Sequence, residues 1–415
     1  MSGRDPGALQ PISAGAVASL VGFASTFAIV LAGLRAVGAD QQQAASGLLA
    51  LCLVGGAMSI ALGLRHRIPL MIAWSTPGAA LLIASGEPTG GYPAALGAFA
   101  FAGALTVIAG LSRGLGRWVA RIPPALASAM LAGVLLPICL APARAVVELP
   151  WEVGPMIMAW VLLMRFARPW AVPGALAVAA IAIALDPLDA PGAASLAPEL
   201  ALTAPTFDAG ALISLGLPLF VVTMASQNIP GVGVLASFGY RAPLRASLVT
   251  TGAGTVVGAP FGAHAISLAA ITAALVAGPE AHPDRARRWI ATVSCGGVYM
   301  VLGIGAGAAA TLVTVAPPLV IDAVAGLALF GALAGAIAAT AADAARREAA
   351  TVTFVVSASS ITVAGISAPF WGLVAGLAYL GLQPTGTALG DGVAPQSRAR
   401  VLATSDRSGV AELDA

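Results

Sequence analysis

The sequence predicts an all-α membrane protein that crosses the bilayer many times, and three observations lead to this fold class. Hydrophobic residues make up 59% of the 415 residues, and only 9% are charged. The mean hydropathy is +0.93, whereas soluble domains are roughly 45–50% apolar and about 25% charged. Because a helical crossing needs about 20 apolar residues, this length accommodates about 14 transmembrane segments with short connections.

Stretches without a charged residue mark the expected spans. They cover residues 6–34, 41–64, 68–86, 88–112, 122–143, 150–167, 169–185, 209–240, 246–279, 289–321, 323–342 and 349–390. Arginines flank 246–279 on the same side of the membrane, so this stretch must cross twice, and the same parity makes 349–390 two spans with a break near Gly365 to Pro369. Fourteen crossings result, and twelve remain an alternative if a short segment is re-entrant.

The arginines orient the chain. All twenty basic residues are arginine, and eighteen of them fall on one side under this scheme, leaving Arg35 and Arg144 on the other. Cytoplasmic loops retain basic residues, so both termini are expected in the cytoplasm of a bacterial cell. The N-terminus lacks the order of a cleaved signal peptide, and the first span is expected to direct insertion.

An acidic, proline-containing linker divides the chain. Residues 186–209 hold four carboxylates and no arginine, and are expected to be periplasmic. Residues 1–185 then form a first repeat of seven spans, and 210–389 a second. Because seven is odd, the second repeat is inverted relative to the first. The polar segment 390–415 is expected to be a disordered cytoplasmic tail.

Composition excludes several function classes. The net charge of +2 and the absence of long basic tracts argue against nucleic acid as a partner. Cys52, Cys139 and Cys295 lie far apart in apolar runs, which predicts neither a disulfide framework nor a zinc site. No HExxH motif and no GxxxxGK[ST] loop is present. We therefore expect no cofactor, no metal and no enzyme, and an enzyme would have to depend on His264 with a nearby serine such as Ser267.

Four interruptions of the apolar pattern pair across the two halves. GFAST at 22–26 corresponds to ASQNIPG at 225–231, and WSTPG at 74–78 to GAPFGAH at 258–264. Broken helices are tolerated at membrane depth only beside protein or a water-filled cavity, and paired breaks indicate a transporter site. Proline kinks in ordinary packing helices are the alternative.

The third and tenth spans are expected to contain half-helices that begin at mid-membrane. Pro77 suits the first turn of a helix starting near Ser75 or Thr76. The mirror half-helix is expected to begin at Gly262 to His264. Two such N-termini offer free amides and positive dipole ends, which suit an anion such as a carboxylate.

At these residues the sequence resembles the benzoate/proton symporter family of bacterial inner membranes, the BenE type. The matching strings are WSTPGAALL at 74–82, VVTMASQNIPGVGVL at 221–235, FGAHAISLAAITAA at 261–274 and GPEAHPDRARRW at 278–289. The resemblance implies the fold of nucleobase and sulfate-type transporters. Spans 1–4 and 8–11 would form a core domain and the others a gate domain, and discontinuous spans 3 and 10, with short extended segments, would hold the substrate near span 8.

The candidate substrate-binding residues come from the four breaks. They are Ser25, Thr26, Ser75, Thr76, Pro77, Gln227, Asn228, Gly262, Ala263 and His264. His264 is expected either to carry the coupled proton and bind the carboxylate, or to be a neutral histidine bonded to a backbone carbonyl. Nucleobase symporters carry a glutamate where Gln227 stands, and a neutral amide suits an anionic substrate better. Trp74 and Phe261 are expected to stack on an aromatic ring or to pack in the core.

The sequence therefore predicts proton-coupled uptake of benzoate or a related aromatic carboxylate by alternating access. An anion channel, or a transporter of another small organic anion or nucleobase, is the alternative. The lipid bilayer is the expected surrounding, and a homodimer is an open alternative to a monomer. Glu280, His282 and Asp284 in the loop after span 10 are expected to cap or gate that loop, with metal binding as the second interpretation.

Overall fold

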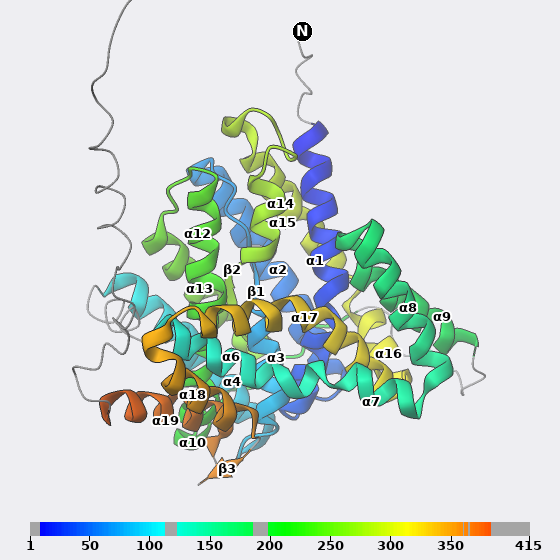
Figure 1. Cartoon of the computed structure of the whole chain (residues 1–415). Coiled ribbons are helices and arrows are strands. Elements are labelled where there is room, and N and C mark those ends of the chain that lie inside the picture. Colours follow the sequence, from blue (N-terminus) through cyan, green and yellow to red (C-terminus); the bar gives the residue numbers. More distant parts are fainter. Residues whose placement is uncertain (1–8, 113–122, 186–197, 360, 364–365, 383–415) are drawn as a thin grey trace, which may run out of the picture.

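The computed structural model describes residues 9–112, 123–185, 198–359, 361–363 and 366–382. The tail 390–415, the first part of the linker and the arginines between 113 and 121 lie outside these described residues. Within them the chain is mostly helical, with two small two-stranded sheets (Figure 1).

The helices of the first half stand in a simple order. They are α1 (Leu9–Ala36), α2 (Gln41–His66), α3 (Thr76–Ser85), α4 (Gly91–Leu111), α6 (Pro124–Cys139), α7 (Ala141–Glu148), α8 (Pro150–Phe166), the 3-10 turn η1 (Arg168–Trp170) and α9 (Ala171–Leu185). Strand β1 (Ile72–Trp74) directly precedes α3. Local chemistry sets several of these boundaries: Asp40 and Gln43 form a reciprocal capping box at the start of α2.

The second half contains more interruptions. Its helical elements are α10 (Ala209–Ala211), η2 (Leu212–Gly216), α11 (Leu217–Thr223), η3 (Met224–Asn228), α12 (Ile229–Ser237), α13 (Leu244–Gly258), η4 (Ala259–Phe261), α14 (Ala270–Ala277), η5 (Arg285–Arg287), α15 (Trp289–Gly303), α16 (Ala306–Val315), α17 (Pro318–Ala341), η6 (Ala344–Arg346), α18 (Arg347–Ala358) and α19 (Ala368–Leu382). The strands are β2 (Ile266–Leu268), β3 (Thr362–Val363) and β4 (Ile366–Ser367).

The helices pack in two groups. In the first, α2 packs against α15, α4 against α13, and α1 against both α3 and α15. In the second, α6 packs against α17 and α18, α18 against α19, and α8 against α9. Figure 1 shows α8 and α9 at one margin of the molecule, with α18 and α19 at another. The first group contains both strands that interrupt the apolar spans.

Strands β1 and β2 pair antiparallel in the buried interior. Their register joins Ile72 to Leu268, Ala73 to Ser267 and Trp74 to Ile266. Side chains from α2 and α13 satisfy backbone groups at the outer edges: Ser59 Oγ exchanges hydrogen bonds with Ile72 (2.9 and 3.1 Å), and Thr255 Oγ1 accepts from the Ile266 amide at 2.9 Å. Non-helical backbone is therefore paired with protein at this depth, as a bilayer requires.

Two glycine crossings bring helices of the two halves into close contact. A Cβ on Gly56 would lie 2.5 Å from the Gly296 carbonyl oxygen, and one on Gly296 would lie 2.6 Å from the Gly56 oxygen. Gly103 and Gly252 make the same reciprocal contact between α4 and α13, at 2.8 and 2.6 Å. Small residues permit such close backbone approach between membrane helices.

The described part of the linker lies against the first group of helices. The Thr203 amide donates to the Pro260 carbonyl and the Thr206 amide to the Pro93 carbonyl, both at 2.9 Å. Ser46 Oγ on α2 accepts from the Ala201 amide, also at 2.9 Å. The linker thus fastens α2, α4 and η4 at one end.

The structure bears out the coarse class and changes several boundaries. Six helices of the described ranges are long and apolar enough to span a membrane, or seven if the α15 and α16 segments, bent by 59°, count as one span. The single span expected at 289–321 is therefore bent, and the twelfth span begins at Pro318 rather than after Asp322. The half-helix expected from His264 begins only at Ala270, because residues 266–268 pair with β1 instead.

Candidate functional site

The first turn of α3 is closed by its own cap. Ser75 Oγ accepts from the Gly78 amide at 3.0 Å, and Pro77 lies in the first turn as the sequence predicts. Thr223 on α11 donates its hydroxyl to Ser75 Oγ at 3.1 Å, and the Ser75 amide donates to the Ala265 carbonyl at 2.9 Å. This helix end is already supplied with hydrogen-bond partners, so it has little left for a ligand.

His264 joins the two interrupted spans. Its Nε2 lies 3.0 Å from the Ser75 carbonyl oxygen, which can only accept, so Nε2 carries a proton. The ring is fully buried and stands edge-on to Phe99 of α4, with ring centroids 6.2 Å apart. Its Nδ1 has no hydrogen-bond partner among the residues the structure describes. The geometry matches the neutral, carbonyl-bonded histidine and leaves one nitrogen able to accept a proton.

The eighth span widens where its two prolines remove hydrogen-bond donors. Pro218 and Pro230 have no N–H, and η2 and η3, both π-helical, lie just before them. Asn228 is fully buried, and its Oδ1 accepts from the Leu268 amide of β2 at 3.0 Å. Gln227 is 6% exposed in the same turn. Asn228 therefore supports the tenth span, as in the second interpretation of these amides.

The N-terminus of α14 has a different chemistry from that of α3. Its N-cap position is Ala269, which makes no side-chain capping bond, so the first-turn amides keep the free donors common to helix starts. Thr272 lies in this turn; its side chain is 8% exposed, and its Oγ1 has no partner within the described part of the chain. Backbone amides, a hydroxyl and the positive end of a helix dipole together suit an anion.

An aromatic cluster lies beside this helix start. The rings of Phe23 and Phe27 on α1 stack at 5.4 Å, and Trp74 lies 6.3 Å from Phe23 and 5.2 Å from Tyr299 of α15. Trp74 Nε1 donates to Thr26 Oγ1 at 3.0 Å.

Gly22 connects the cluster to α14. A Cβ at Gly22 would lie 2.6 Å from the Tyr299 hydroxyl oxygen and 3.1 Å from Thr272 Cγ2. The aromatic faces and the uncapped helix start are therefore neighbours.

The predicted residues divide into three sets. Thr26, Gln227 and Asn228 surround the β2–α14 junction with Trp74, whereas Ser75, Pro77 and His264 form the α3 start and Thr76 is half-buried there. Ser25 is half-buried on α1. Gly262 and Ala263 lie earlier, in the turn after η4.

Gly262 has a conformational role in that turn. Its φ is +96°, which favours glycine. A Cβ there would lie 2.8 Å from Gly47 Cα. Ala263 is fully buried, and its amide donates to the Gly258 carbonyl at 3.1 Å. These contacts close the turn against α2, and the helix start expected at Gly262 to His264 is replaced by the one at Ala270.

Sequence reasoning missed Thr223, Thr272 and Tyr299. Thr272 stands inside the string that resembles the known family, but placing the helix start at His264 put it two turns into the helix. Tyr299 is one of four tyrosines in the chain, and its burial at a charge-free depth was the available signal. Nothing in the sequence pairs Thr223 with Ser75.

The loop after α14 is held by a buried arginine. Arg288 Nε donates to the His282 carbonyl and its Nη1 to the Ala277 carbonyl at the end of α14, both at 2.7 Å. Asp284 Oδ1 accepts from the Ala286 amide at 2.8 Å. No group of three metal-ligating side chains occurs in the described ranges. These contacts support the loop-capping interpretation of Glu280, His282 and Asp284.

The enzyme alternative has no support in this geometry. Ser267 lies in β2 opposite Ala73, and its Oγ makes no hydrogen bond to any described residue, His264 included. A serine activated by a neighbouring histidine requires that contact.

Comparison with known proteins gives one family and one fold. The profile of the family described as benzoate membrane transport protein matches residues 6–382. Inner membrane protein YdcO of Escherichia coli K12 is 36% identical over 367 residues, covering 88% of this chain and 93% of that protein. The benzoate membrane transport protein of Acinetobacter baylyi is 28% identical over 379 residues, covering 89% and 94%.

Two solved structures have a similar fold. The transmembrane domain of the cyanobacterial bicarbonate transporter BicA aligns with a TM-score of 0.61 at 18% identity, covering 89% of this chain and 97% of that one. SLC26A9 aligns with a TM-score of 0.58 at 15% identity, covering 89% and 65%. At these identities the likeness concerns the fold alone.

Proposed function

The chain belongs to the benzoate membrane transport protein family, and from this premise we propose that it takes up benzoate or a related aromatic carboxylate together with a proton. It is a membrane transporter, and the bacterial inner membrane is its proposed location. The proposal rests chiefly on one observation: the uncapped start of α14, with the buried Thr272 hydroxyl, adjoins an aromatic cluster.

The carboxylate would bind at the start of α14. A helix N-terminus carries roughly half a unit of positive charge, and free amides can donate to a carboxylate oxygen without moving. Thr272 adds a hydroxyl donor. Gln227 lies in η3, which packs against both β2 and α14, and presents no negative charge. An acidic residue there would repel the substrate by several kcal/mol at about 4 Å and an effective dielectric of about 20.

The aromatic ring of the substrate would contact Trp74, Phe23 and Tyr299. Aromatic pairs prefer edge-to-face or offset arrangements with centroids about 4.5–7 Å apart, and the rings in this cluster already use such spacings with each other. Thr26 would keep Trp74 in place through its hydrogen bond. A polar end and an apolar end thus lie at the correct relation for an aromatic acid.

We propose that residues 1–185 and 210–389 are inverted repeats related by an axis between β1 and β2. Three correspondences support this. The strands pair antiparallel, Ser59 and Thr255 serve equivalent backbone groups, and the glycine crossings occur once between α2 and α15 and once between α13 and α4. Fourteen crossings, with α1–α4 and α10–α15 as core and the remaining helices as gate, are part of the same proposal.

Uptake into proteoliposomes tests the function. Labelled benzoate should accumulate above its equilibrium level when the outside is more acidic and the membrane potential is clamped at zero, and a protonophore should abolish the accumulation. An anion channel would equilibrate benzoate without accumulating it. Excess unlabelled aromatic carboxylate should compete, whereas competition by a nucleobase instead would contradict the proposed substrate class.

His264 is the proposed proton carrier, and His264→Gln separates coupling from binding. Glutamine retains an N–H that can donate to the Ser75 carbonyl, yet cannot carry a proton at neutral pH. A buried charge is costly unless it is paired, so protonation of His264 would be favoured when an anionic substrate is bound. The variant should lose gradient-driven accumulation and retain benzoate exchange. Unchanged accumulation would leave His264 a structural residue.

A further inference from the structure

The turn between α18 and α19 meets the core helices through one serine. Ser367 in β4 is 6% exposed. Its Oγ donates to the Ser214 carbonyl oxygen of η2 at 3.1 Å. The same Oγ lies 3.4 Å from the Ser85 hydroxyl at the end of α3. One hydroxyl from the proposed gate therefore contacts two different spans of the proposed core.

The Ser214 carbonyl is exceptional within its helix. In an α-helix it would accept from the residue four positions later, but that residue is Pro218, which has no N–H. The surrounding turn, Leu212–Gly216, is π-helical, and its buried carbonyl requires a donor from elsewhere. Ser367 supplies that donor.

The contact lies at one end of the molecule. Ser85 is the last residue of α3, and Ser214 stands near the beginning of the span that starts with α10. Figure 1 shows α10, β3 and α19 together at the end opposite the N-terminus of α1. The arginine distribution predicts that this end is periplasmic.

We propose that Ser367, Ser214 and Ser85 form a clasp that holds gate and core together on this side and opens in every transport cycle. The proposal rests on the proposed function, because a clasp between two bodies matters only if those bodies move. The contact is small and partly between neutral groups, so it can form and break reversibly: a neutral intramolecular hydrogen bond shifts an equilibrium by about fivefold.

A double-cysteine variant, Ser85→Cys with Ser367→Cys, tests the opening. Because the two hydroxyl oxygens are 3.4 Å apart, an oxidant should join the two sulfurs. The native cysteines Cys52, Cys139 and Cys295 are all buried. The joined protein should lose at least about nine-tenths of benzoate uptake and recover it on reduction, while the single variants keep it. Uptake at the wild-type rate after joining, or failure of the sulfurs to join, would overturn the clasp.

A second measurement does not depend on the substrate. Ser367→Ala should raise the amide exchange rate of residues 209–217 by about fivefold, since the segment loses one hydrogen bond to the gate. Ser359→Ala is the matched control, because Ser359 is exposed in the same connection and donates only to the nearby Val356 carbonyl. Equal exchange in both variants would overturn the clasp. Absence of benzoate uptake by wild type with faster exchange in Ser367→Ala would instead contradict the proposed substrate.

Discussion

Thr272 shows how strongly the role of a single residue depends on its position relative to a helix end. A threonine in the middle of a membrane helix usually bonds back to its own carbonyls, as Thr106 does to Ala102 at 2.9 Å. In the first turn of α14 the Thr272 hydroxyl makes no such bond among the described residues. A buried hydroxyl without a partner is costly, so it is retained where a ligand uses it.

Thr272→Val removes this hydroxyl while keeping the shape of the side chain. The affinity for benzoate should fall by about tenfold or more, because a hydrogen bond to a charged group contributes roughly 1.5–3 kcal/mol. The free energy of unfolding should stay the same or rise. Equilibrium binding and thermal unfolding of the purified protein measure the two effects. Thr106→Val is the control, and its benzoate affinity should be unchanged; equal losses in both variants would contradict the role of Thr272.

At the scale of elements, the two glycine crossings determine how closely helices from the two halves approach. Gly296 and Gly297 are adjacent on α15 and have opposite surroundings. A Cβ at Gly296 would meet the Gly56 oxygen at 2.6 Å, whereas a Cβ at Gly297 has nothing within 4 Å. Adjacent positions thus provide a test and its control within one helix.

Gly296→Ala should lower the free energy of unfolding by about 1–3 kcal/mol, the usual cost of forcing an extra methyl group into a packed contact. Gly297→Ala should have no effect or stabilise slightly, because alanine has the higher helix propensity. Thermal unfolding in detergent compares the two. If the substitutions shift the midpoint equally, the crossing is not a close contact in the folded protein.

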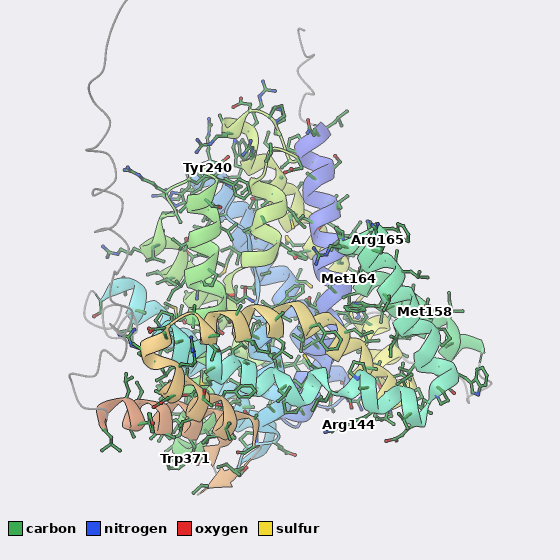
Figure 2. All side chains as sticks on the ribbon, viewed as in Figure 1. Arg144, Met158, Met164, Arg165, Tyr240 and Trp371 are labelled. Atoms are coloured by element: carbon green, nitrogen blue, oxygen red, sulfur yellow. The ribbon has the colours of Figure 1, made fainter. Side chains whose placement is uncertain are left out.

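At the scale of the whole molecule, basic residues separate by side. Figure 2 shows Arg165 and Tyr240 toward the end where α1 begins, and Arg144 and Trp371 toward the opposite end. This arrangement agrees with the sequence scheme, which assigns Arg165 to the cytoplasmic side and Arg144 to the periplasmic side. Orientation relative to the cell remains a prediction.

Reporter fusions test that orientation. A fusion at residue 189 in the linker should give a periplasmic signal, and one after Arg398 a cytoplasmic signal, because eighteen of the twenty arginines lie on one side in the scheme. A fusion in the loop at Pro283 is the internal control and should match Arg398. A cytoplasmic signal at residue 189 would contradict the seven-plus-seven arrangement.

The sequence by itself determined the membrane class, most span positions and the four interruptions, because hydropathy and the absence of an N–H in proline are local properties. It also placed the start of α3, where Ser75 and Pro77 form a cap from adjacent residues. These features need no partner from elsewhere in the chain.

Only the tertiary structure decided which interrupted helix offers free donors. Residues 266–268 become β2 because β1, Thr255 and Asn228 satisfy their backbone groups. This pairing moves the helix start to Ala270 and brings Thr272 into the first turn. Thr223 meanwhile completes the cap of α3 from a distant span. Such hydrogen bonds join residues far apart in the chain, so no local pattern could reveal that α3 is closed and α14 open.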